Sequence, residues 1–269
     1  MASLLSELHF SLRVNHKKLT RGSKTTRVER NEQFEHISLM RETFAQRQLP
    51  IVSIDTKKKE LVGNFKNPGT RWSKEADRVL DHDFRSDAEG IAIPGGIYDT
   101  QANRGTVFVG TSHNTAEFTV ENLARWWTSE GRDRYPRASE LLVLADGGGS
   151  NGARSRGFKY NLQTRLCDVY GIDVTVCHYP TGASKWNPIE HRLFSQISLN
   201  WAGQPLRSYE TILNYINTTT ITTGLRVTAH LIDQHYTTGI KVSDALMATL
   251  NLDRHEVQPQ RNYTIRARS

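Results

Sequence analysis

The sequence predicts an α/β fold, a mixed sheet flanked by helices, and three observations support this class. Predicted strands and helices follow one another between residues 51 and 200 in an alternating order. The run LLVLA at residues 141–145 is wholly apolar, which is typical of a strand buried on both faces of a sheet. The chain has 269 residues, 37% of them hydrophobic, and this is enough to build a sizeable core.

Residues 1–48 are predicted to form a helical, basic N-terminal segment. Leucines recur at helical spacing at its start, and Phe34, Ile37 and Phe44 mark the apolar side of a second helix. Residues 11–30 carry an excess of six positive charges. This block is either a solvated linker or a segment that contacts phosphates.

Four strands are predicted after Pro50, at residues 51–55, 61–65, 97–100 and 106–110. The first two flank the polar stretch DTKKKE, and we predict that they pair as a hairpin. A fifth and a sixth strand are predicted at residues 141–145 and 172–176.

Three helices are predicted to cover the sheet. The first begins at a capping-box pattern formed by Asn114 and Glu117. The second ends at Gly171, which stands where a C-terminal cap is expected. The third begins at Asn187, with Pro188 as its first residue.

Composition limits the function classes. Thirty-five Lys and Arg against 28 Asp and Glu give a net charge of +7, which favours an anionic partner such as nucleic acid. No apolar run approaches the ~20 residues of a membrane span, and the N-terminus has no signal-peptide pattern. Cys167 and Cys177 are the two cysteines, so no disulfide framework is indicated and we expect a cytoplasmic protein without a membrane partner.

Three carboxylates stand at the ends of predicted elements. Asp55 and Asp146 each end an apolar strand, and Glu190 lies one turn into a helix. If the strands are neighbours and the helix packs across them, the three groups converge at one edge of the sheet. Their mutual repulsion would be relieved by a divalent cation, and oxygen ligands alone favour Mg²⁺ or Mn²⁺.

Each carboxylate has an alternative interpretation. Asp55 and Asp146 are also typical of turns that leave a strand. Glu190 fits the third position of a capping box that begins at Asn187, and a capping box needs no metal. From spacing alone, these alternatives stay open.

Six long motifs resemble the DDE-type transposases of bacterial insertion sequences, in the group called Rhodopirellula transposases. The resemblance runs from about residue 4 to about residue 250, and the motifs stand in the right order. The motifs are SIDTKKKELVGNF, AIPGGIYD, TAEFTVENLARWW, ADGGGSNG, VTVCHYPTGASKWNPIEHRLFSQIS and TTGIKVSDA.

The resemblance implies a catalytic and metal-binding triad of Asp55, Asp146 and Glu190 that holds Mg²⁺ or Mn²⁺, as two ions. It also implies a ribonuclease H-like core, which we place at residues 49–203 between the N-terminal segment 1–48 and a C-terminal extension 204–269. Such transposases usually carry a helix-turn-helix region before the stretch that begins here, so we expect an N-terminally truncated form.

Further residues beside the triad are candidates for DNA binding. Lysines 57 to 59 are also typical of a solvated hairpin tip, and Trp186 of a core residue that anchors its helix. The candidates are Lys57, Lys58, Lys59, Ser150, Asn151, Arg154, Lys185 and Trp186.

The sequence therefore predicts a transposase that cleaves DNA and transfers strands through two metal ions, with element ends and target DNA as partners and a homo-oligomer on DNA. Two other functions remain alternatives. One is a catalytically silent remnant that binds DNA or a full-length transposase, and the other is a ribonuclease H-like nuclease.

Overall fold

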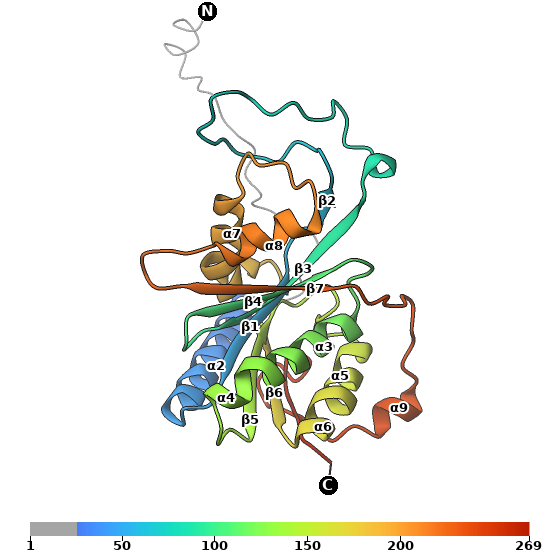
Figure 1. The fold of residues 1–269 in the computed structure, drawn as a ribbon. Helices are drawn as coiled ribbons and strands as arrows, with labels where there is room; N and C mark the ends of the chain where they lie inside the picture. The colour runs from blue at the N-terminus through green and yellow to red at the C-terminus, as the bar shows by residue number, and fades with distance from the viewer. Residues whose placement is uncertain (1–25, 269) are drawn as a thin grey trace, which may run out of the picture.

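The computed structural model describes residues 26–268 (Figure 1). The leucine helix predicted at the N-terminus and most of the basic block 11–30 lie outside these residues. The second predicted helix is confirmed as α2 (Arg27–Gln46), which begins with a capping box between Thr26 and Glu29.

A mixed sheet forms the centre of the molecule, as predicted. Its strand order is β7-β4-β3-β1-β5-β6-β9-β8, with β2 paired to β3. The central strands β1, β5 and β6 are parallel to one another, and β3 is antiparallel to both β1 and β4. The strands are β1 (Ile51–Thr56), β2 (Glu60–Val62), β3 (Gly90–Asp99), β4 (Arg104–Gly110), β5 (Glu140–Ala145), β6 (Asp173–His178), β7 (Arg226–Ile232), β8 (Leu252–Arg254) and β9 (Asn262–Ile265).

The predicted hairpin of β1 and β2 is wrong. Both strands pair with β3, β1 along residues 95–99 and β2 along residues 90–92. Because β1 and β2 are both antiparallel to β3, they run in the same direction, and residues 57–59 connect them without reversing the chain. Lys57 donates its backbone N–H to Pro94 O at 2.9 Å. Residues 57–59 contain no Gly, Asn or Pro, the residues that a tight reversal requires.

Helices cover both faces of the sheet (Figure 1). One face carries the segments predicted as the first two helices, and Gly171 ends the second in the left-handed conformation at φ 62°. The helical segments on this face are α3 (Ala116–Trp126), η2 (Trp127–Gly131), α4 (Arg132–Arg134), α5 (Arg156–Asn161), η3 (Leu162–Cys167) and α6 (Asp168–Tyr170). The capping box predicted at Asn114 and Glu117 is wrong, because Thr115 caps α3 and Glu117 pairs with Arg165 instead.

The opposite face carries α2 and the third predicted helix. That helix comprises η5 (Glu190–Phe194) and α7 (Ser195–Asn200), and it packs beside α8 (Tyr209–Asn217). Three short segments lie outside these layers: η1 (Arg85–Asp87), η4 (Ser184–Trp186) and α9 (Asp244–Ala248).

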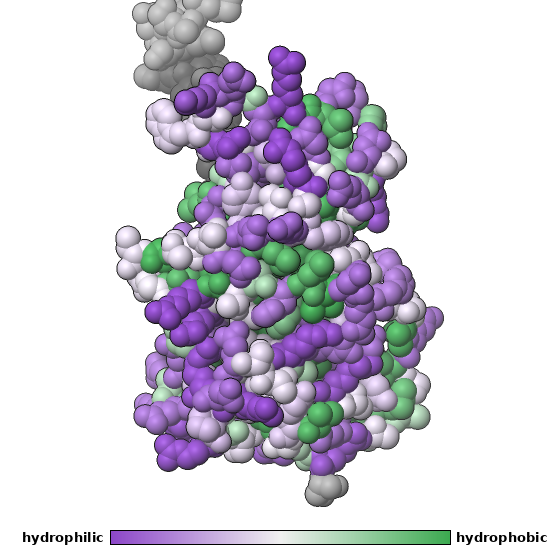
Figure 2. All heavy atoms as spheres, in the orientation of Figure 1, coloured by the Kyte–Doolittle hydropathy of each residue, from purple (hydrophilic) through white to green (hydrophobic). Residues whose placement is uncertain are grey.

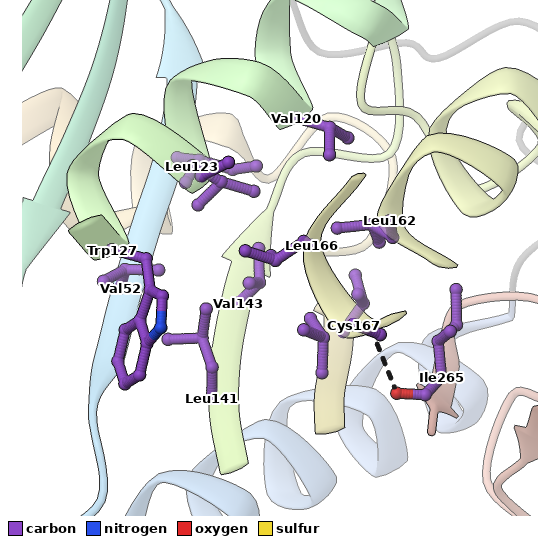
Figure 3. Packing of buried hydrophobic residues seen from close by; sticks show 14 of the residues in the cluster. Val52, Val120, Leu123, Trp127, Leu141, Val143, Leu162, Leu166, Cys167 and Ile265 are labelled. Carbon is purple, nitrogen blue, oxygen red and sulfur yellow. Dashed lines mark hydrogen bonds between the residues drawn. The ribbon is translucent and has the colours of Figure 1, made fainter. Parts of the chain in front are cut away.

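The central strand β5 is buried on both faces, as its apolar sequence predicts. Leu141 and Val143 join the cluster under α3 and η3, where Cys167 donates its thiol to Ile265 O (Figure 3). Leu142 and Leu144 belong to the opposite cluster, against α2. Alternate residues of a strand point to opposite faces, so this one strand supplies both layers of the core.

Within the described residues, the C-terminal extension contributes strands at both edges of the core sheet. Strand β7 pairs in parallel with β4, while β9 pairs with β6 on the far side. The boundary predicted at residue 203 is therefore not a break in the sheet. Helix α2 is also tied to this region, because Gln33 and Asn262 exchange side-chain hydrogen bonds of 2.8 and 2.7 Å.

The surface is polar over most of the face drawn in Figure 2, with small scattered hydrophobic patches. Within residues 26–268, no helix combines the length and the apolar character that crossing a membrane requires.

Candidate active site

Asp55 and Asp146 lie side by side at the carboxyl ends of two neighbouring central strands, β1 and β5. Strands β1 and β5 are parallel neighbours with Ile54 opposite Ala145, so the next residue on each chain is an aspartate. Because paired residues point to the same face, both carboxylates lie on the face that carries α2 and η5. The structure thus brings together two residues that are 91 positions apart in sequence.

Glu190 lies on the helix that covers this face, and its capping-box interpretation is wrong. The Asn187 side chain does not cap its own helix: its Oδ1 accepts a hydrogen bond from Ser53 Oγ, and its Nδ2 donates to Ile54 O at 3.2 Å. Ser53 Oγ in turn accepts a hydrogen bond from Ile189 N at 3.0 Å. Strand β1 therefore caps the helix. Glu190 N donates to the backbone oxygen of Asn187 at 3.1 Å, but the two side chains do not make the bonds of a capping box.

Two glycines let the Glu190 helix approach the sheet closely. A Cβ on Gly96, the β3 residue paired with Asp55, would lie 2.6 Å from Phe194 and 2.9 Å from Ile189. A Cβ on Gly105 would lie 2.4 Å from Leu193. Contacts this short are not tolerated, so the helix keeps its position only because these residues have no side chain.

The three half-buried carboxylates interact electrostatically. Burial, followed by the charge of Asp146, raises the pKa of Asp55 from 3.8 to about 7, and Glu190 adds to this shift. Burial and the charge of Glu190 likewise raise the pKa of Asp146, whereas the Asn187 amide lowers it. The site therefore concentrates negative charge that a cation would neutralise.

The donor chemistry of the site fits a hard divalent cation. All three side chains offer oxygen, and Asp146 Oδ1 is buried without a hydrogen-bond partner among the described residues. Asp55 Oδ1 accepts a single hydrogen bond, from Thr56 N at 2.7 Å. Within residues 26–268, however, no group of three Asp, Glu, His or Cys side chains is arranged so that it could hold a metal ion in common.

The loop after Asp146 is held by buried polar contacts. His178 Nε2 bonds to Asn151 O at 2.8 Å, and the ammonium of Lys159 donates to Ala153 O. Ser150 Oγ donates to Asn114 Oδ1 at 3.0 Å. Asn151 is 3% exposed, so it supports the loop and does not offer its side chain to the surface.

The three lysines after Asp55 differ in their surroundings. Lys57 pairs with Glu60 at 3.0 Å, and its ammonium lies 4.6 Å from the centroid of the Trp201 ring. Its side chain is only 12% exposed, which gives Lys57 a structural role. Lys58 and Lys59 are exposed and remain candidates for phosphate contacts.

The other exposed candidates are Arg154, Lys185 and Trp186. Trp186 is 58% exposed, so it is not the core anchor that the alternative interpretation proposed. It packs edge-on against Phe34, with 6.0 Å between the ring centroids, and Lys185 Nζ lies 5.5 Å from its ring. Trp186 is therefore accessible to solvent beside the segment that carries Glu190.

Sequence reasoning missed Ser53, and it interpreted Asn187 only as a helix cap. Both are fully buried. The available signal was a serine at an inward-facing position of an apolar strand, because a buried hydroxyl requires a partner.

The family model of the Rhodopirellula transposase DDE domain matches residues 1–267. The chain belongs to this family. No curated protein matches it.

Among solved structures, this family member is similar to the Mos1 strand transfer complex, with a TM-score of 0.52 and 16% identity over 80% of this chain and 59% of that chain. It is also similar to the Mos1 mariner paired-end complex with Mn, with a TM-score of 0.48 and 19% identity over 80% and 60% of the two chains. The chain thus spans about 60% of the length of those transposases. The likeness to the first confirms the ribonuclease H-like fold.

A pH-dependent stability follows from the raised pKa of Asp55. In the metal-free protein this carboxyl binds a proton more tightly when folded than when unfolded, so its contribution to stability falls as the pH rises from 3.8 to about 7. Asp55→Asn removes this titration. In chelator, the melting temperature of the variant should therefore rise relative to that of the unaltered chain between pH 5 and pH 8. An equal difference in melting temperature at both pH values would contradict the raised pKa.

Proposed function

We propose that this chain is the catalytic part of a DNA transposase, which cleaves a DNA strand and transfers it to a target through Asp55, Asp146 and Glu190. The observation that carries the proposal is their convergence: two aspartates end adjacent parallel strands, and a glutamate is held above them by a helix fixed to one of those strands. Membership of the DDE transposase family supports the same roles.

Asp55, Asp146 and Glu190 have separate positions in the proposed phosphodiester transfer. Asp55 and Asp146 present oxygens from a rigid sheet, and Glu190 presents its oxygens from the opposite side. Two Mg²⁺ or Mn²⁺ ions held there would activate a water or a 3′-hydroxyl and stabilise the leaving oxygen. Oxygen ligands alone suit a hard cation of this kind.

The DNA backbone is proposed to lie along the carboxylate edge. Lys58, Lys59, Arg154 and Lys185 are exposed there, each on a segment that adjoins a carboxylate in sequence. Cations of this kind position DNA through phosphate contacts. Trp186 offers an aromatic surface on which a base can stack.

Removing two of these cations should weaken DNA binding. The double variant Lys58→Ala and Lys59→Ala is expected to lower affinity for duplex DNA and to reduce the slope of log affinity against log salt by about two. Arg137→Ala is the matched control, because Arg137 is exposed just before β5, at the opposite edge of the sheet. An unchanged salt slope in the double variant would contradict this placement of the DNA.

The function is tested by a strand-transfer assay with the terminal DNA of the mobile element and a plasmid target. Covalent insertion products that form with Mg²⁺ or Mn²⁺ and disappear with chelator support a transposase. DNA binding without cleavage would favour the silent remnant, and cleavage of RNA–DNA hybrids without insertion would favour the nuclease. Light scattering with and without DNA tests the proposed homo-oligomer.

A further inference from the structure

We propose that Ser53 and Asn187 form a latch that positions Glu190 over the two aspartates. The latch consists of three hydrogen bonds: Ser53 Oγ to Asn187 Oδ1, Ile189 N to Ser53 Oγ, and Asn187 Nδ2 to Ile54 O. The proposal deepens the proposed function, on which it rests. Ser53 and Asn187 are positioning residues, because they act through Glu190 and Asp55.

Ser53 and Asn187 each lie close in sequence to a carboxylate of the site. Ser53 lies two residues before Asp55 on the same face of β1, and Asn187 lies three residues before Glu190. Each latch residue is therefore within one turn or one strand repeat of the carboxylate that it serves. A shift at the latch passes directly to the spacing between Asp55 and Glu190.

The latch also fixes where the helix begins. An ordinary N-cap is supplied by the helix's own preceding residue, which leaves the helix free to slide over the sheet. Here the cap is the hydroxyl of a strand residue 136 positions away. Pro188 follows Asn187 and restricts the first turn further, so the start of the helix is registered to β1.

Burial makes the latch costly to break. Ser53 and Asn187 are both 0% exposed, and an unpaired polar group at such a depth loses its hydration without compensation. Asn187 thus joins the start of the Glu190 helix to the two strand residues that precede Asp55.

The test measures Mn²⁺ binding to the full chain by calorimetry, without DNA. Loss of a partner that orients a metal ligand typically costs 10- to 100-fold in affinity, so Ser53→Ala should raise the Mn²⁺ dissociation constant about tenfold. Ser53→Thr keeps the hydroxyl and should restore most of the affinity. Asn187→Ala tests the same latch from the helix side, and the double variant should lose no more than the weaker-binding single variant, because both changes break one unit.

Thr175→Val is the matched control. It removes a buried hydroxyl of β6 that pairs with Thr264 of β9 at 2.8 Å. Thr175 lies opposite Leu142, three residue pairs before the end of β5. Its melting temperature should fall while its Mn²⁺ affinity stays unchanged. Ser53→Ala binding Mn²⁺ as tightly as the unaltered chain would overturn the latch alone. Failure of the unaltered chain to bind Mn²⁺ would overturn the proposed function and the latch together.

Discussion

Glu190→Gln is expected to reduce DNA strand cleavage by on the order of 10³-fold, because a divalent cation held by the carboxylate contributes several kcal/mol of charge stabilisation. The fold should remain intact. Glutamine matches glutamate in shape, and Ser53 rather than Glu190 caps the helix. Release of a labelled DNA end and a thermal melt of the same preparation measure the two effects.

Glu210→Gln is the matched control for that substitution. Glu210 also stands in the first turn of a helix, α8, but it is exposed and outside the carboxylate group. Its cleavage rate should equal that of the unaltered chain. Normal cleavage by Glu190→Gln would show that Glu190 is not part of the catalytic site.

Gly96→Ala should impair both stability and cleavage. The added methyl would lie 2.6 Å from Phe194, and forcing extra volume into a packed core typically costs about 1–3 kcal/mol. The helix must move away from β3 and carry Glu190 with it. A displacement near 1 Å at a reacting centre can cost about 10²-fold in rate, so cleavage should fall by about this factor.

Gly157→Ala serves as the control for Gly96→Ala. Its added Cβ would meet Ala116 at 3.4 Å, an ordinary contact, and it lies within α5. Helix propensity makes this change neutral or stabilising by up to about 1 kcal/mol. Should Gly96→Ala melt and cleave like Gly157→Ala, the close approach of the helix would not matter for the site.

The sheet and its two aspartates could be predicted because their signals are local. An apolar run that ends in an acidic residue marks both a buried strand and the edge where it stops, and this holds for Asp55 and for Asp146. Parallel pairing of β1 and β5 then brings the carboxylates together without any further information.

Glu190 could not be assigned from spacing, because its pattern satisfies two structures equally. Asn187 at a helix start is a good N-cap, but here its side chain bonds to Ser53 Oγ and Ile54 O of the distant strand β1. The same limit applies to β2 and β9. Their partners are chosen by long-range pairing, which the local alternation of residues does not encode.

The run of three lysines after Asp55 does not show, from sequence alone, which of the three side chains are exposed. Lysines 57 to 59 look equivalent in the run KKK, yet Lys57 contacts Glu60 and Trp201 whereas Lys58 and Lys59 are exposed to solvent. Trp186 shows the reverse case, since a tryptophan beside an apolar helix is expected in the core but is exposed here.

The proposed function requires Asp55, Asp146 and Glu190 to act as one cation-dependent site. Its most direct test is cleavage of end-labelled element DNA by the unaltered chain and by Asp146→Asn, each with Mg²⁺ and with chelator. Cut strands are expected only for the unaltered chain with Mg²⁺, while both proteins melt cooperatively and bind DNA. Equal cleavage by Asp146→Asn, or cleavage that persists in chelator, would contradict it.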